Sequence, residues 1–271
     1  MNSKLPDVGT TIFSVMSAMA SECGAINLSQ GFPDFTPNEY LLDRLSYHAH
    51  NGKNQYAPMN GIPELRQAIA TLTKKCYGRA INPDTEITLA SGATEALFVA
   101  IQAVVNPGDE VILLDPAYDS YAPAVTLAGG SCKHISLMPP HYQPDWQQIE
   151  AAVSAKTRLI IVNSPHNPTA TVFSDDDWLA LANLAEKHNL FVISDEVYEH
   201  IVFNQARNSA HRYPALFDRT FVISSFGKTF HATGWKLGYC IAPPALSVEF
   251  RKIHQFVTFT SFTPAQYAVA D

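Results

Sequence analysis

The stretch TFVISSFGKTFHATGWKLG, residues 220–238, joins an apolar run to small and hydroxylated residues that surround two lysines, Lys228 and Lys236. The β-branched run at its start is typical of a buried strand. The tripeptide GKT around Lys228 matches the end of a P-loop, but that motif needs a glycine five residues earlier, where Val222 stands. The sequence therefore excludes a P-loop, and the rest of the chain must explain the two lysines.

Short apolar segments alternate with amphipathic ones upstream of this stretch. The predicted strands are EITLA (86–90), EVILLD (110–115), CKHISL (132–137), RLIIVN (158–163), LFVISD (190–195) and TFVISS (220–225). The predicted helices cover 64–77, 91–105, 120–128, 145–153 and 174–189. This alternation predicts an α/β fold with a mostly parallel central sheet flanked by helices.

Composition limits the class of protein. The chain has 271 residues, 46% of them hydrophobic, and a formal net charge of −7. No basic run suggests nucleic acid as a partner, and no apolar stretch approaches a membrane span. Four cysteines stand far apart without a CxxC pair and are expected as buried free thiols: Cys23, Cys76, Cys132 and Cys240. We therefore expect a cytoplasmic protein.

Metal-binding patterns are weak in this sequence. The histidines of the HAH pair, His48 and His50, would face different sides of a helix, and no HExxH occurs. The acidic run 175–177 is interpreted as the first turn of a helix. We predict no metal site.

Polar residues follow several of the predicted strands where they end. Ligands of open α/β sheets bind at the carboxyl ends of the strands. The residues there are Ser91, Gly92, Ala93 and Thr94 after the first strand, Tyr118 after the second, Asn167 after the fourth, Asp195 and Tyr198 after the fifth, and Ser225 and Lys228 after the sixth. Each alone could be a cap or a turn residue. Together they predict a ligand site.

An ordered set of motifs extends this pattern over the chain: NLSQGFPDF, NQYAPMNGIPELRQAIA, SGATEAL, PGDEVILLDPAYDSY, NSPHNPT, SDEVYEH and SSFGKTFHATGWKLGY. The set resembles the fold-type I, class I/II pyridoxal-phosphate aminotransferases, especially the methionine, glutamine and kynurenine group. The resemblance implies an N-terminal arm and small-domain segment over 1–36 and the large, PLP-binding domain over 37–271. It also implies a C-terminal small domain beyond Asp271, with the arginine that grips the substrate α-carboxylate.

The resemblance assigns the chemistry to five residues. Lys228 would bind the aldehyde of pyridoxal 5'-phosphate as a Schiff base, which only an amine can form, and would then carry the substrate's proton. Asp195 would pair with the protonated pyridine nitrogen. Tyr198 and Asn167 would hydrogen-bond the ring's phenolate oxygen, and Tyr118 would stack on the ring face.

The phosphate would be bound at the N-terminus of the second predicted helix. Gly92, Ala93 and Thr94 offer free N–H groups there, where the helix dipole favours an anion. Ser225 would add a hydroxyl group, and Lys236 a positive charge where many related enzymes have arginine. The alternative for Lys236 is an ordinary surface lysine.

Three further residues are assigned by the resemblance alone. Tyr56 is similar to the tyrosine that reaches the phosphate from the partner subunit, which implies a homodimer. Gly31 is similar to a backbone contact of the substrate carboxylate, and Phe13 to a residue at the substrate entrance.

The resemblance implies transfer of the amino group of an uncharged amino acid (methionine, glutamine or aromatic) to a 2-oxo acid. Two alternatives stay open: a related lyase of the cysteine-S-conjugate β-lyase type, and a non-catalytic PLP-binding module.

Overall fold

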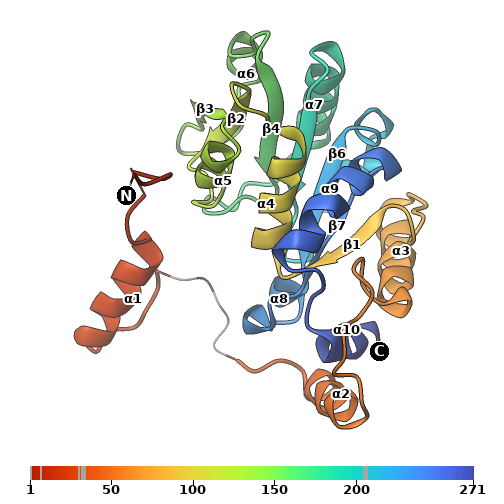
Figure 1. Ribbon diagram of the computed structural model, residues 1–271. Helices are drawn as coiled ribbons and strands as arrows, with labels where there is room; N and C mark the ends of the chain where they lie inside the picture. The colour runs from red at the N-terminus through yellow and green to blue at the C-terminus, as the bar shows by residue number, and fades with distance from the viewer. Residues whose placement is uncertain (1, 7, 30, 32–34, 204–206) are drawn as a thin grey trace.

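The computed structural model describes residues 2–6, 8–29, 31, 35–203 and 207–271. Seven strands in these residues form one sheet in the order β1-β7-β6-β5-β4-β2-β3 (Figure 1). Their bounds are β1 (Ile87–Ala90), β2 (Glu110–Asp115), β3 (Ser131–Ser136), β4 (Thr157–Asn163), β5 (Phe191–Asp195), β6 (Thr220–Ser225) and β7 (Gly238–Ile241). The six predicted strands are β1 to β6, within one or two residues at each end.

Strands β3, β2, β4, β5 and β6 run parallel, which confirms the predicted mostly parallel sheet. The strand β7 was not predicted. It pairs antiparallel with both β6 and β1, because the chain returns beside β6 through the short segment that carries the two lysines. Gly238 makes this return possible, since a Cβ there would lie 2.7 Å from the carbonyl oxygen of Ser224 and 3.0 Å from the amide nitrogen of Ala93.

Helices cover both faces of the sheet (Figure 1). The α-helices are α1 (Ile12–Glu22), α2 (Glu39–His50), α3 (Pro63–Tyr77), α4 (Ala93–Val104), α5 (Tyr121–Leu127), α6 (Trp146–Ala151), α7 (Asp175–Lys187), α8 (Phe226–Thr229), α9 (Pro244–Val257) and α10 (Thr263–Ala270). Three 3-10 helices complete the set: η1 (Ala210–Arg212), η2 (Pro214–Leu216) and η3 (Thr233–Trp235). One apolar core contains residues of α4, α5 and α9, and the other contains residues of α3, α6, α7 and α10.

Local signals in the sequence account for the helix ends. Pro63 is the first residue of α3, and Gly78 ends that helix in the left-handed conformation at φ 78°. The side chain of Ser174 accepts a hydrogen bond from the backbone N–H of Asp177 in a capping box. The acidic run 175–177 is therefore the first turn of α7, as predicted.

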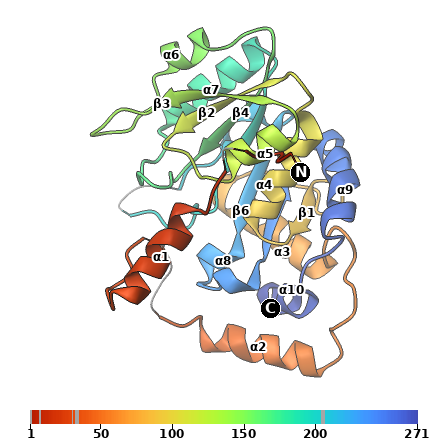
Figure 2. The ribbon, with the colours of Figure 1, turned by 60° about the vertical axis from the view of Figure 1, so that its left-hand side comes forward.

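The N-terminal helix α1 stands clear of the sheet and its covering helices (Figures 1 and 2). Helix α2 instead packs on α10, where Asp271 accepts hydrogen bonds from Arg44 Nε at 2.5 Å and His48 Nε2 at 2.7 Å. The domain division at residue 36 stays a prediction.

All four cysteines are free thiols. The prediction that they are buried holds for Cys240 and is wrong for Cys23, which is exposed beyond the end of α1, because that helix buries none of its side chains. None of the helices in the described residues is long and apolar enough to cross a membrane.

Candidate active site

Lys228 lies in α8, at the carboxyl edge of the sheet, directly after β6. Its Nζ donates a hydrogen bond to the carbonyl oxygen of Gly31 at 3.3 Å and lies 5.4 Å from the centre of the Tyr198 ring. Burial lowers the pKa of Lys228, the positive charge of Lys236 lowers it further, and the carboxylate of Asp195 acts in the opposite direction. Lys228 is therefore a half-buried amine whose neutral form is favoured relative to a surface lysine.

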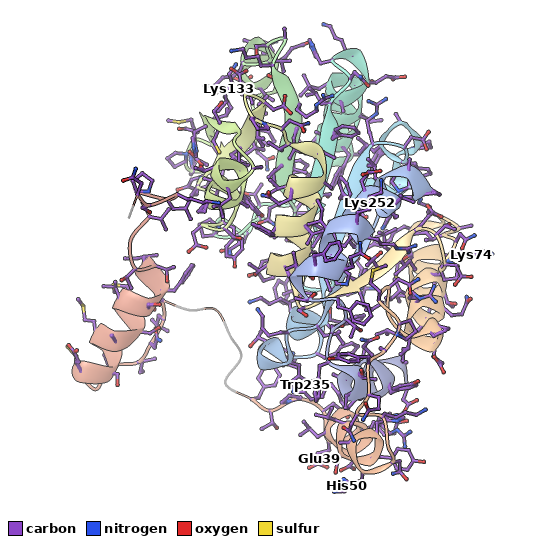
Figure 3. The ribbon with its side chains drawn as sticks, viewed as in Figure 1. Glu39, His50, Lys74, Lys133, Trp235 and Lys252 are labelled. Atoms are coloured by element: carbon purple, nitrogen blue, oxygen red, sulfur yellow. The ribbon has the colours of Figure 1, made fainter. Side chains whose placement is uncertain are left out.

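Three other lysines of the chain have an ordinary surface environment (Figure 3). Lys133 pairs with Glu110 at 2.8 Å, and Lys252 pairs with Glu249 at 2.7 Å on the outside of α9. Lys74 lies exposed on α3. The position of Lys228 against a tyrosine ring and within reach of a buried carboxylate sets it apart from these three.

Asp195 ends β5 with its side chain buried. Burial raises the pKa of Asp195 to about 6, although hydrogen bonds from Tyr121 Oη at 2.6 Å and the backbone N–H of Val197 at 3.3 Å favour the ionised form. The charge of Lys228 also favours the ionised form. A buried carboxylate with few partners is suited to bind a cationic group.

Tyr198, Asn167 and Tyr118 lie around this pair. Burial, followed by the charge of Asp195, raises the pKa of Tyr198, so its phenol stays a hydrogen-bond donor. Asn167 and Tyr198 both line a cavity of about 390 Å³. The hydroxyl groups of Tyr118 and Thr94 lie 3.3 Å apart, which brings the end of β2 to the start of α4.

The N-terminus of α4 forms a small cradle with Lys236. Gly92 precedes the helix at φ 83°, and a Cβ there would lie 3.3 Å from Cε and 3.4 Å from Nζ of Lys236. Lys236 itself has a left-handed backbone at φ 50°. Its ammonium group therefore lies beside the first N–H groups of α4, which have no partner within the helix. Positive charge and free donors together favour a phosphate group.

Ser225 ends β6 beside this cradle. Ser225 pairs with Gly238 of β7. The backbone of Gly92 and Ala93 lies directly beside Gly238. Six segments that carry predicted site residues thus meet at the carboxyl edge of the sheet: the ends of β1, β2, β4, β5 and β6, and the turn before β7.

Two predicted residues are not brought to this place in the single chain. Tyr56 is 84% exposed, and its ring contacts Phe259 at 5.7 Å between ring centres. Phe13 belongs to α1, which stands apart from the sheet (Figure 2). Gly31, by contrast, is placed by its contact with Lys228.

Sequence reasoning missed two residues that hold the site together. Tyr121 donates to Asp195, and its position three residues after Tyr118 in PAYDSY was an available signal. Asn163 donates from Nδ2 to the carbonyl oxygen of Asp195 at 2.8 Å and accepts from the backbone N–H of Asn167 at 2.6 Å. Asn163 was missed because it is the last residue of β4 and its sequence position indicates only a buried strand.

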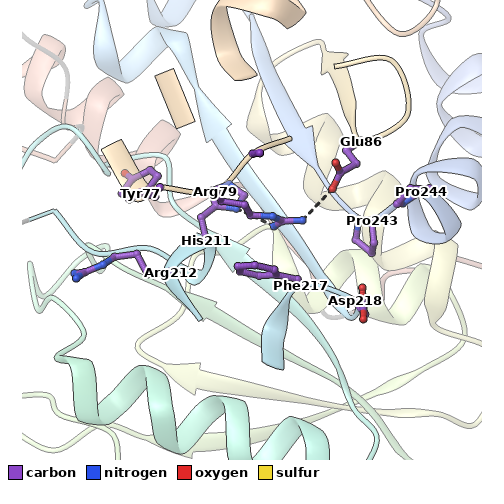
Figure 4. Close-up of a pocket in the computed structure, with 11 residues that line it drawn as sticks. Tyr77, Arg79, Glu86, His211, Arg212, Phe217, Asp218, Pro243 and Pro244 are labelled. Carbon is purple, nitrogen blue, oxygen red and sulfur yellow. Dashed lines mark hydrogen bonds and ion pairs between the residues drawn. The ribbon is translucent and has the colours of Figure 1, made fainter. Parts of the chain in front are cut away.

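A second cavity of about 540 Å³ lies at the opposite edge of the sheet, near the start of β1 and the end of β7 (Figure 4). Arg79 crosses it, paired with Glu86 at 3.0 Å, hydrogen-bonded to His211 at 3.0 Å and stacked on Phe217 at 4.2 Å. None of the predicted site residues lines this cavity, and its central cation is already paired.

The sequence profile of the aminotransferase class I and II family matches residues 24–271. The chain belongs to this family. Its members depend on pyridoxal phosphate, and an amine, a buried carboxylate and an anion cradle at one sheet edge are what that cofactor requires. The match extends beyond the site to nearly the whole chain.

Characterised members of the family are similar to this chain over nearly all of its length, but they are longer. Methionine aminotransferase of Escherichia coli is 55% identical over 270 residues, which cover 99% of this chain and 70% of that protein. Kynurenine–oxoglutarate transaminase 3 of Rattus norvegicus is 37% identical and covered to 62%. The crystal structure of YbdL from Escherichia coli, described as having a methionine aminotransferase function, superposes with a TM-score of 0.97 at 54% identity, over 100% of this chain and 71% of that one.

The structure of N-succinyldiaminopimelate aminotransferase from Mycobacterium tuberculosis gives a TM-score of 0.96 at 40% identity, again over 100% of this chain and 71% of that one. Both solved relatives thus confirm the α/β fold.

Proposed function

We propose that this protein transfers the amino group of an uncharged amino acid, of the methionine, glutamine or aromatic type, to a 2-oxo acid with pyridoxal phosphate as its cofactor. The observation that carries the proposal is the position of Lys228. Its half-buried amine lies over Tyr198 and within electrostatic range of both Asp195 and Lys236. One reactive amine between an anion and a cation fits a cofactor that has a cationic ring nitrogen and an anionic phosphate.

The described residues fit the cofactor part by part. Asp195 would hold the proton on the ring nitrogen, and Tyr198 and Asn167 would donate to the ring's phenolate oxygen. Tyr118 would cover the ring face. The cradle made by Gly92, Ala93, Thr94, Ser225 and Lys236 would hold the phosphate. When bound, the cofactor supplies an electron sink for the electron pair left at the substrate α-carbon.

Proton transfer is the step that this chain's own residues perform. With a lowered pKa, Lys228 can be neutral once the substrate amine has taken its place, and Nζ can then accept the proton of the substrate α-carbon. The 3.3 Å contact of Nζ with the carbonyl oxygen of Gly31 supports a role for that stretch of chain in binding the substrate. Asp195, to which Tyr121 donates a hydrogen bond, would balance the positive charge of the ring nitrogen.

The preference for uncharged substrates rests on the relatives. A methionine aminotransferase is 55% identical to this chain, and kynurenine transaminases are 35–38% identical. The chain spans about 70% of the first of these relatives. Its four free thiols agree with a cytoplasmic location.

A homodimer is part of the proposal. The exposed ring of Tyr56 lies beside Phe259, and Phe256 and Phe262 near the end of α9 are exposed as well. A second copy would cover these aromatic side chains and would bring Tyr56 to the phosphate cradle of its partner.

The cofactor anchor can be tested by labelling. The protein is reduced with borohydride in the presence of pyridoxal phosphate, digested, and searched for the modified lysine by mass spectrometry. The label is expected on Lys228 and should be absent from Lys228→Ala, with Lys252→Ala as a surface control that keeps it. A label on Lys236 would show that the anchor is wrong.

The reaction can be tested by mixing the loaded protein with single amino acids. Methionine, glutamine and phenylalanine should each discharge the visible absorbance of the cofactor and release a stoichiometric 2-oxo acid, whereas aspartate should react slowly. Release of pyruvate and ammonia from a cysteine conjugate, without formation of the amine form of the cofactor, would instead show a β-lyase. A loaded protein that reacts with none of these would favour a binding module.

A further inference from the structure

His254 lies in the last turn of α9 and is fully buried. Its Nδ1 is 2.9 Å from Glu95 Oε1, and its Nε2 is 3.1 Å from the carbonyl oxygen of Met59. A carbonyl oxygen can only accept hydrogen bonds, and an ionised carboxylate likewise only accepts. A neutral imidazole has a single N–H, whereas an imidazolium donates from both nitrogens. The geometry thus matches an imidazolium.

Glu95 is held in place by the backbone at the start of α4. Glu95 lies in the first turn of α4, and its Oε2 accepts the backbone N–H of Ser91 at 3.0 Å. The dipole of α4 stabilises a negative charge at that end. A buried ion pair whose remaining atoms are also hydrogen-bonded avoids the large penalty of an unpaired buried charge.

Few other titratable groups face this pair. On α9, the guanidinium of Arg251 donates to Thr88 Oγ1 at 2.9 Å and to the carbonyl oxygen of Ile87 at 2.7 Å. On β7, burial and the charge of Glu95 raise the pKa of Cys240, so its thiol stays neutral. The loop of Met59 carries the exposed Tyr56. Glu95 is therefore the anion that balances His254.

The loop that His254 holds is the one that carries Tyr56. Besides the bond to Met59, this loop receives hydrogen bonds from Thr260 Oγ1 to Pro58 O at 3.4 Å and from Thr263 Oγ1 to Gln55 O at 2.8 Å. Of these three side chains, His254 is the one that also contacts α4, through Glu95. It connects the loop to the turn at the phosphate cradle.

We propose that His254 is a positioning residue, which as an imidazolium ties the anion-binding turn at the N-terminus of α4 to the loop that carries Tyr56. The inference rests on the proposed function, since it takes that turn as the phosphate site. Without His254, the carboxylate of Glu95 loses its counter-ion and the turn at Ser91 and Gly92 loses a fixed partner. Binding of a phosphate group should weaken, while contacts to the ring stay unchanged.

The test compares two ligands, pyridoxal phosphate and pyridoxal, which lacks the phosphate. For His254→Gln, the dissociation constant of pyridoxal phosphate is expected to rise about tenfold, the equivalent of about 1.4 kcal/mol, with no change for pyridoxal. His50→Gln, the same substitution at an exposed histidine, should change neither. Equal weakening for both ligands would overturn the proposal, because a general structural defect does not select the phosphate.

The variant Lys236→Met distinguishes an error in the proposed phosphate site from an error in the role of His254. It should also weaken pyridoxal phosphate selectively. If Lys236→Met shows no selectivity, the phosphate site of the proposed function is wrong. If Lys236→Met is selective and His254→Gln is not, only the role of His254 is wrong.

A spectroscopic measurement tests the protonation state without the cofactor. In the ¹⁵N-labelled protein, both ring nitrogens of His254 are expected to carry protons at neutral pH, and Glu95→Gln should convert the ring to the neutral form. A wild-type ring with one bare nitrogen would overturn the proposal. If His254→Gln does not fold, Glu95→Gln replaces it in the ligand comparison, with the same phosphate-selective loss expected.

Discussion

Tyr121 donates a hydrogen bond of 2.6 Å to Asp195 Oδ2 and is itself buried at the start of α5. The bond joins the end of β5 to the segment that follows β2, two strands away in the sheet. Burial and the neighbouring charge of Asp195 raise the pKa of Tyr121 well above its usual range, so this phenol keeps its proton and stays a donor. Asp195 thus depends on Tyr121 to be ionised in a buried place.

Tyr121→Phe removes this donor and should raise the pKa of Asp195 above about 6. Because the ionised form is the one that binds the ring nitrogen, the acid limb of the pH profile of kcat/KM should move upward. A shift of about one pH unit corresponds to the ~1.5 kcal/mol that a hydrogen bond to a charged group contributes. Tyr40→Phe, at an exposed tyrosine, is the control. An acid limb that stays in place would show that Tyr121 does not stabilise the carboxylate.

Asp195→Asn should stabilise the cofactor-free protein while abolishing most of its activity. The pKa of Asp195 is raised in the folded state from 3.8 to about 6, so the folded protein binds more protons than the unfolded one between these values. Its free energy of unfolding therefore falls as the pH rises through that window, by up to about 3 kcal/mol in all. Asparagine removes this loss but cannot hold a cationic ring nitrogen.

The measurement is urea unfolding of both cofactor-free proteins at pH 4 and pH 7. The variant should gain stability relative to the wild type at pH 7 and little at pH 4. A variant that is less stable at both values, or one with near-normal transamination, would contradict the role of Asp195.

Sequence patterns predicted the parallel strands β2, β4, β5 and β6 well because each is a short apolar run closed by a polar residue. They also placed Lys228 and Asp195 together, since both follow such runs. The antiparallel β7 escaped prediction, because GYCI is too short to show a pattern and its place is set by the close approach of Gly238 to Ala93.

Contacts between segments that are far apart in the chain could not be predicted from the sequence either. His254 and Glu95 are 159 residues apart and meet only because α9 packs on α4. The proposed contact of Tyr56 with a second copy would likewise leave no trace in the pattern of one chain.

Gly92→Ala should weaken the binding of pyridoxal phosphate more than it weakens the fold. At φ 83° a side chain is strained by about 1 kcal/mol, and the added Cβ would also press on Lys236 at 3.3 Å. The ammonium group must then move from the start of α4. Gly78→Ala is the control, since Gly78 also has a positive φ, of 78°, and has open space around it, although its ψ of −8° is tolerated by a side chain better than the ψ of 166° at Gly92. Both variants should lose stability, Gly92→Ala the more, and only Gly92→Ala should lose cofactor affinity. Equal affinities would show that the cradle tolerates a Cβ.

Glu196 presents a buried carboxyl group directly behind the site. Its Oε1 accepts from Ser194 Oγ at 2.8 Å and from the backbone N–H of Ala210 at 3.0 Å, whereas Oε2 has no partner among the described residues. Burial, and next the charge of Glu199, raises the pKa of Glu196 to about 8. The nearby Glu199 accepts hydrogen bonds from Tyr77, Ser224 and Tyr239 instead.

Glu196→Gln should therefore stabilise the protein increasingly as the pH rises. The unfolded side chain ionises near pH 4.5, but the folded one holds its proton to about pH 8, so the wild type loses stability through this window. Glutamine keeps the acceptor for Ser194 and Ala210 and has no charge to bury. The gain in the free energy of unfolding should be small at pH 5 and about 2–5 kcal/mol at pH 9. Glu186→Gln, on the exposed side of α7, should show no such trend. If the gain is the same at pH 5 and pH 9, Glu196 is ionised in the folded protein over this whole range. Its negative charge would then be balanced by a group other than those that donate hydrogen bonds to Glu199.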